Sequence, residues 1–197
     1  LVPVGAIELE FYLLDRERDA LGLPQAPRGP LSGRREHRTQ INSMLDLDEY
    51  SAVLADIDSV CRAQAVPSTT ALAEYGPGQF EVNLLHGPDA LRACDEAMRF
   101  RRIVKCVSRR HGLDATFLSK PYPDMAGSGL HVHVSLNDRD GRNVFAADDP
   151  LGSPRMQHAA AGMLASMADG MAIFAPLANA WRRFRPDAYV PLTADWS

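Results

Sequence analysis

The 197-residue sequence predicts an α+β fold, in which a β-sheet is covered on one face by long helices. Two segments, 2–15 and 130–136, alternate polar and apolar residues at the period of a half-buried strand. A third segment, 88–111, carries apolar residues at helical spacing over its whole length. No apolar run approaches the roughly 20 residues that a membrane-spanning helix needs, so the sequence predicts no membrane contact.

The first half of the chain predicts strands separated by a loop and a helix. In chain order, we expect a strand at 2–15, a loop rich in proline, glycine and arginine at 24–39, a helix at 48–64 and a strand at 68–73. Gly76-Pro77-Gly78 then forces a turn. Because Glu74 and Glu81 flank this turn, their carboxylates can converge.

The second half of the chain predicts two long helices around further strands. Asp89 begins the helix 88–111 and Gly112 ends it. We then expect a short strand at 114–118, the strand 130–136, a hairpin-type turn at 137–141 and a helix that starts at Ser153-Pro154. The apolar residues of the last helix are expected to be core: Met156, Met163, Leu164, Met167, Met171 and Ile173.

The composition is typical of a cytoplasmic protein that does not bind nucleic acid. The formal net charge is −4 and the pI is about 5.8, which argues against a nucleic-acid-binding surface. Cys94 and Cys106 lie about 18 Å apart along one expected helix, beyond disulfide reach. We therefore expect reduced, buried thiols. The opening segment contains Glu8 and Glu10 and has no basic leader, so it does not predict a signal peptide.

Acids and histidines gather on two of the expected strands. Glu8 and Glu10 share one strand face, and His131, His133 and Ser135 share a face of another strand. Two carboxylates so placed repel each other unless a cation or basic groups lie between them. The strands therefore predict either a cation or phosphate site, or polar surface strands whose acids meet lysine or arginine.

The acids at the Gly76-Pro77-Gly78 turn extend this group. Glu74 and Glu81 add two carboxylates, and no thiolate accompanies them, which favours Mg²⁺ or Mn²⁺ over Zn²⁺. Paired divalent ions with lysine and arginine nearby are used to neutralise a transferring phosphoryl group. Neither a Walker GxxxxGK[ST] motif nor a kinase glycine loop is present. A nucleotide site would therefore belong to a less common scaffold.

Four blocks of the sequence resemble, in order, those of the glutamine synthetase family. They are Glu8-Leu9-Glu10-Phe11, the block 74–81, the ATP-binding signature from Lys120-Pro121-Tyr122 to Ser135, and the block 179–186. The resemblance spans nearly the whole chain. It implies a curved antiparallel sheet whose concave face carries the acids and histidines, with helices on the convex face. A helix layer such as 88–111 is then expected to cover the apolar strand residues Ile7, Leu9, Phe11, Val132 and Val134. It also implies that residues 1–197 are a catalytic-domain fragment, without an N-terminal β-grasp domain and a C-terminal remainder, and inactive alone.

The resemblance also assigns roles to individual residues. Glu10, Glu74 and Glu81 would hold one Mg²⁺ or Mn²⁺, and Glu8 and His131 a second, with His131 counted as catalytic. Lys120, His133 and Ser135 would bind ATP. Arg183, also catalytic, and the flexible Gly127-Ser128-Gly129 loop would bind glutamate.

The implied reaction is ATP-dependent formation of a γ-glutamyl amide through γ-glutamyl phosphate, by a ring-shaped homo-oligomer when full length. Ammonia-using members have asparagine where this chain has Ala126, and a glutamate where it has Tyr189. These departures favour an organic amine, as in the γ-glutamylputrescine synthetase branch. Glutamine synthetase using ammonia is the alternative, followed by an inactive structural or regulatory homologue. Phosphagen kinases, a further phosphoryl-transfer class with a related catalytic sheet, are disfavoured because they lack the Gly-Ser-Gly-x-His-x-His pattern.

Overall fold

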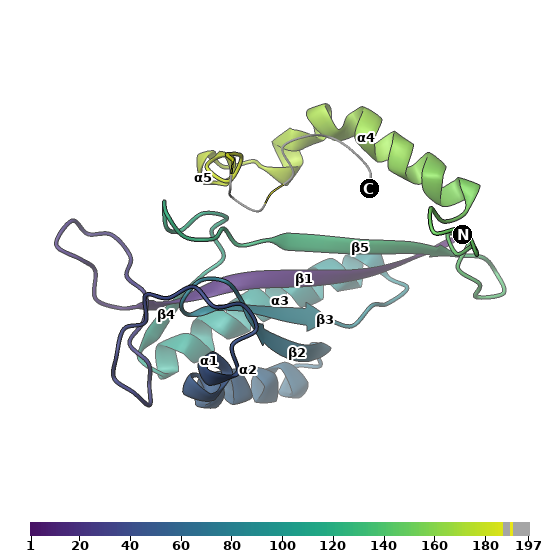
Figure 1. The fold of residues 1–197 in the computed structure, drawn as a ribbon. Coiled ribbons are helices and arrows are strands. Elements are labelled where there is room, and N and C mark those ends of the chain that lie inside the picture. The colour runs from purple at the N-terminus through teal and green to yellow at the C-terminus, as the bar shows by residue number, and fades with distance from the viewer. Residues whose placement is uncertain (187–189, 191–197) are drawn as a thin grey trace.

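The fold is organised around one long strand, β1 (Val2–Asp15), in the computed structural model, which describes residues 1–186 and 190. One edge of β1 pairs with β3 (Gln79–Leu84). The opposite edge pairs with β5 (Leu130–Asn137) and, near the end of β1, with β4 (Leu113–Thr116). β2 (Ser68–Ala73) pairs with β3. Every pairing is antiparallel, so the sheet is an open antiparallel one (Figure 1).

Helices α2 and α3 cover one face of this sheet (Figure 1). The helices are α1 (Met44–Glu49), α2 (Ser51–Ala63), α3 (Ala90–Arg110), α4 (Pro154–Phe174) and α5 (Ala178–Trp181). The expected helix at 48–64 is thus two helices that meet at Tyr50. The α+β class is confirmed.

Alternation along β1 decides which face is covered. Ile7, Leu9 and Phe11 are buried in the core with α2 and α3. The Phe11 ring lies 6.2 Å from the ring of Phe80 and 6.2 Å from that of Phe100, centroid to centroid. Burial of one such side chain contributes roughly 1.5–3 kcal/mol. Glu8 and Glu10 alternate with these residues, so they face away from the helices.

The sequence signals for α3 are confirmed by its ends. The Asp89 side chain accepts a hydrogen bond from the Arg92 amide at 3.0 Å, as an N-cap. After the helix, Gly112 has φ +75°, the left-handed conformation that glycine adopts without steric cost.

Two expectations about apolar burial are wrong. Val132 and Val134 on β5 are 60% and 57% exposed, so α3 does not cover them. On α4, Met163 is 66% exposed, Ile173 is 79% exposed, and Ala160 is the one buried residue of the helix. The reason is position: α4 lies beyond β5, on the side away from α2 and α3 (Figure 1).

The thiols also differ from expectation. Cys61, a residue of α2, is buried as expected, whereas Cys94 and Cys106 are exposed. The apolar stripe of α3 runs through Phe100 and Val104, and the two cysteines lie off that stripe. Among the described residues, no helix combines the length and apolar character needed to cross a bilayer.

Candidate active site

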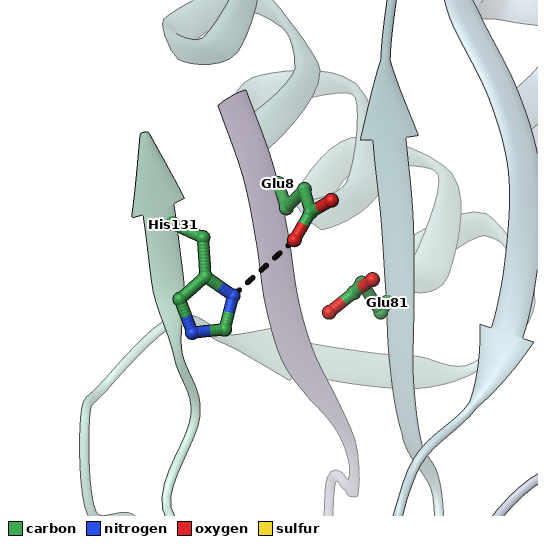
Figure 2. Close-up of side chains that lie close together, drawn as sticks. All are labelled: Glu8, Glu81 and His131. Carbon is green, nitrogen blue, oxygen red and sulfur yellow. Dashed lines mark ion pairs between the residues drawn. The ribbon is translucent and has the colours of Figure 1, made fainter. Parts of the chain in front are cut away.

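Three strands bring Glu8, Glu81 and His131 together on the face opposite the helices (Figure 2). Glu8 on β1 is the register partner of His131 on β5, and its near neighbour Glu10 is the partner of Glu81 on β3. One potential ligand atom from each of Glu8, Glu81 and His131 lies within 4.8 Å of the others. Alternation alone puts these side chains on one face, and the strand register makes them neighbours.

Both histidines of β5 contact Glu8. His131 Nδ1 lies 3.3 Å from Glu8 Oε2, and His133 Nε2 lies 3.0 Å from Glu8 Oε1. Asn83, with its amide oriented to satisfy its neighbours, donates to Glu8 Oε1 at 3.1 Å and to Glu81 Oε1 at 3.3 Å. At Glu8, the partners are histidines rather than the lysine or arginine of the polar-surface alternative.

Negative charge is concentrated here. Burial, and then the charges of Glu8 and Glu10, raise the pKa of Glu81, although His131 opposes the shift. Burial, and then Glu10 and Glu81, raise the pKa of Glu74 to about 7. Raised pKa values on crowded carboxylates mean that positive charge at this place would be strongly favoured.

The contacts of Glu10 and Glu81 differ from the predicted grouping. Glu81 contacts the Glu8–His131 pair, whereas Glu10 Oε2 accepts a 2.9 Å hydrogen bond from Gln79 Nε2. Glu74 interacts electrostatically with both Glu10 and Glu81. The division of these acids between two ions therefore stays a prediction.

The donor set fits a hard divalent cation. Carboxylate oxygens dominate it, one imidazole joins them, and no thiolate takes part. Mg²⁺ and Mn²⁺ prefer such oxygen-rich sites.

Arg183 and the glycine loop lie next to the acids. Arg183 Nη1 donates to the Ser128 carbonyl at 2.8 Å, and the Glu10 amide donates to the Gly129 carbonyl at 3.2 Å. Within the described part of the chain, Arg183 Nε and Ser128 Oγ are buried without a hydrogen-bond partner. Burial lowers the pKa of Arg183, while Glu10 opposes this. Buried polar groups without a hydrogen-bond partner are candidate contacts for a hydrogen-bonding ligand.

The loop glycines are explained by space rather than by flexibility. A Cβ on Gly127 would lie 2.6 Å from the Ser119 carbonyl oxygen and 2.7 Å from Arg183 Nε. A Cβ on Gly129 would lie 2.6 Å from Glu10 Oε1. The loop therefore packs directly against the charged groups.

Glu8 also lines a shallow hollow of about 450 Å³. Its polar lining is Glu8, His86, His133 and Ser135. Lys120, the third predicted ATP ligand, does not line this hollow. It is 4% exposed, and its ammonium donates to the Met125 carbonyl. Burial, and then two nearby arginines, lower its pKa.

The sequence prediction did not include three polar residues of this region: Gln79, Asn83 and His86. Gln79 and Asn83 alternate in phase with Glu81 on β3, and this signal could have identified them. His86 follows the strand, and no periodicity indicated it. Tyr189, one of the two departures from ammonia-using enzymes, lies outside the described residues.

Comparisons with known proteins point to one family. The family profile described as glutamine synthetase, catalytic domain, matches residues 1–197. γ-Glutamylputrescine synthetase PuuA of Escherichia coli K12 is 44% identical over 196 residues, which are 100% of this chain and 42% of the relative. Glutamate–isopropylamine ligase of a Pseudomonas species is 31% identical over 194 residues, 98% of this chain and 41% of the relative.

A solved structure described as apo GmaS without ligand superposes with a TM-score of 0.79 at 28% identity, and covers 92% of this chain and 41% of that one. The chain spans about two fifths of the length of the curated relatives it matches.

Proposed function

The chain belongs to the glutamine synthetase family, and we propose that it supplies catalytic residues of an ATP-dependent ligase that joins the γ-carboxylate of glutamate to an amine. The cluster of Glu8, Glu81 and His131 is the observation that carries the proposal. Two anionic substrates repel each other in water, and a carboxylate site that collects cations lets them approach.

The proposed metal ligands are Glu8, Glu81 and His131 for one Mg²⁺ or Mn²⁺, and Glu10 and Glu74 with Glu81 for another. When bound, such ions neutralise phosphate charge and orient the phosphoryl group. Asn83 and His133 hold the Glu8 carboxylate in place by direct contacts, so it is preorganised for that task.

Arg183 and Ser128 are the proposed glutamate-binding groups. Arg183 Nε and Ser128 Oγ lack partners among the described residues, and a carboxylate would satisfy both with charge-assisted hydrogen bonds. Gly127 and Gly129 leave the space that brings this loop against Arg183 and Glu10.

The hollow beside Glu8 is the proposed nucleotide site. His133, Ser135 and His86 present polar atoms there, and Lys120 is retained as a proposed ATP-binding residue. ATP would phosphorylate the γ-carboxylate, and the amine nitrogen would attack the resulting γ-glutamyl phosphate and release phosphate. Arg183 would orient the glutamate throughout, because its guanidinium is fixed by Ser128.

An organic amine is the preferred nucleophile in this proposal. The relatives named γ-glutamylputrescine synthetase and glutamate–isopropylamine ligase support it, as does Ala126 in place of asparagine. We also propose that the full-length protein is a cytoplasmic, ring-shaped homo-oligomer.

Steady-state ADP release by the full-length protein, with glutamate and with putrescine, isopropylamine or ammonium, tests the proposal. We expect a higher kcat/KM for an amine than for ammonium. A clear preference for ammonium would instead support glutamine synthetase. A protein with no Mg²⁺- or Mn²⁺-dependent ATP binding would support the inactive homologue.

A further inference from the structure

We propose that the buried cross-strand pair Tyr12–Gln79 is a positioning device that couples the Glu10 carboxylate to the loop 126–129. Tyr12 on β1 and Gln79 on β3 are register partners. The inference rests on the proposed function, because that function assigns Glu10 to a metal and the loop to glutamate.

The Gln79 amide joins three segments of the chain. Its side-chain oxygen accepts from the Gly76 amide at 2.9 Å, and its Nε2 donates to Glu10 Oε2 at 2.9 Å and to the Gly127 carbonyl at 3.1 Å. Gln79 is 2% exposed. Both N–H groups and the oxygen of the amide are therefore used, and this fixes its orientation.

Tyr12 holds the neighbouring residue of the same loop. Its hydroxyl donates to the Ala126 carbonyl at 2.9 Å, and the residue is fully buried. The ring fits because residue 76 is glycine: a Cβ there would lie 2.1 Å from the Tyr12 hydroxyl. Tyr122 packs edge-on against the ring at 5.2 Å between centroids.

Tyr12 and Gln79 thus donate hydrogen bonds to consecutive loop carbonyls, those of residues 126 and 127. The Glu10 amide binds a third, that of Gly129. Because one amide group of Gln79 contacts both Glu10 and Gly127, a change in loop position changes the support of the carboxylate. The Tyr12 hydroxyl donates its hydrogen bond to the loop rather than to Glu10. This difference separates the two residues experimentally.

We expect the Gln79→Met variant of the full-length protein to bind Mn²⁺ about 10- to 100-fold more weakly, as is typical when the hydrogen-bond partner of a metal ligand is lost. Its KM for glutamate rises as well, while its KM for ATP stays within about twofold, because the side-chain hydrogen bonds of Gln79 go to Gly76, Glu10 and Gly127 and not to the proposed nucleotide site. The measurements are calorimetric Mn²⁺ titration without substrates and steady-state kinetics. Unchanged Mn²⁺ affinity in a folded Gln79→Met variant overturns the proposal.

Tyr12→Phe removes one hydroxyl and provides a second test of the proposal, which holds even if Gln79→Met does not fold. We expect it to raise the KM for glutamate severalfold and to leave Mn²⁺ affinity within about twofold. An unchanged KM for glutamate, or equal effects on glutamate and ATP, contradicts the proposal.

Ser108→Ala is the matched control. Ser108 is fully buried and donates to the Val104 carbonyl at 2.7 Å within α3, on the helical layer. It reports general destabilisation, and we expect unchanged Mn²⁺ affinity. The Mn²⁺ titration does not need turnover: an inactive parent would refute the ligase, while the comparison of affinities still decides the role of Gln79.

Discussion

Replacing Glu81 by glutamine removes one charge from the crowded carboxylates and keeps the shape of the side chain. Glu81 is 8% exposed and lies within 4.8 Å of a Glu8 carboxylate oxygen. At an effective dielectric constant of about 20, two unit charges at that distance repel by about 3.5 kcal/mol. Water at the half-exposed Glu8 and the lost attraction of His131 reduce the net relief to about 1–2 kcal/mol. Metal-free Glu81→Gln should therefore be more stable than the parent.

With Mn²⁺ bound, the parent should be more stable than the Glu81→Gln variant. A ligand at 100 times its Kd stabilises the parent by about 2.7 kcal/mol, and a variant that has lost a ligand gains far less. Thermal unfolding of the full-length protein, with EDTA and with Mn²⁺, measures both effects as changes in Tm.

Glu96→Gln is the matched control for this experiment. Glu96 is 6% exposed but accepts a 2.7 Å hydrogen bond from Arg92 Nε. Its neutralisation should not stabilise the protein, and it should leave the Mn²⁺ effect intact. If Glu81→Gln destabilises the metal-free protein, or gains as much from Mn²⁺ as the parent, the argument from charge crowding is refuted.

Three further predictions follow from the same geometry. The raised pKa of Glu74, about 7, means that its contribution to stability is complete below about pH 4.5 and is lost as the pH rises through 7. In EDTA, the Tm of Glu74→Gln should therefore fall less than that of the parent over this range. Parallel curves of Tm against pH for the two proteins would contradict this prediction. Arg183→Lys keeps the charge but loses the planar fork, so the KM for glutamate should rise about 10- to 100-fold with the KM for ATP unchanged; equal rises in steady-state assays would argue against a glutamate contact. Gly127→Ala should cost about 1–3 kcal/mol in urea unfolding because of its 2.6 Å approach to the Ser119 carbonyl, whereas Gly162→Ala, in open space within α4, should be neutral or stabilising; equal effects would show that the loop is not tightly packed.

Much of the fold was predictable because local signals are strong where alternation and capping agree. The strands at 2–15, 68–73 and 130–136 and the helix after Asp89 match the structure closely. The meeting of Glu8 with His131 depended on strand register, which no local pattern encodes, and only the resemblance to a family suggested it.

Burial was predicted less well, because an apolar pattern shows that a surface avoids water but not which element covers it. Val134 on β5 and Met163 on α4 follow a core-like pattern, yet both are exposed. Gln79 was missed for a different reason: it alternates in phase with Glu81 on β3, but an uncharged amide does not by itself indicate a site residue, and its role follows from its three hydrogen bonds.

The position of bound metal tests the central claim most directly. In a crystal of the full-length protein soaked with Mn²⁺, anomalous scattering should place an ion in contact with Glu8, Glu81 and His131. Mn²⁺ found only at other residues, or absent from this cluster at saturating concentration, would contradict the account.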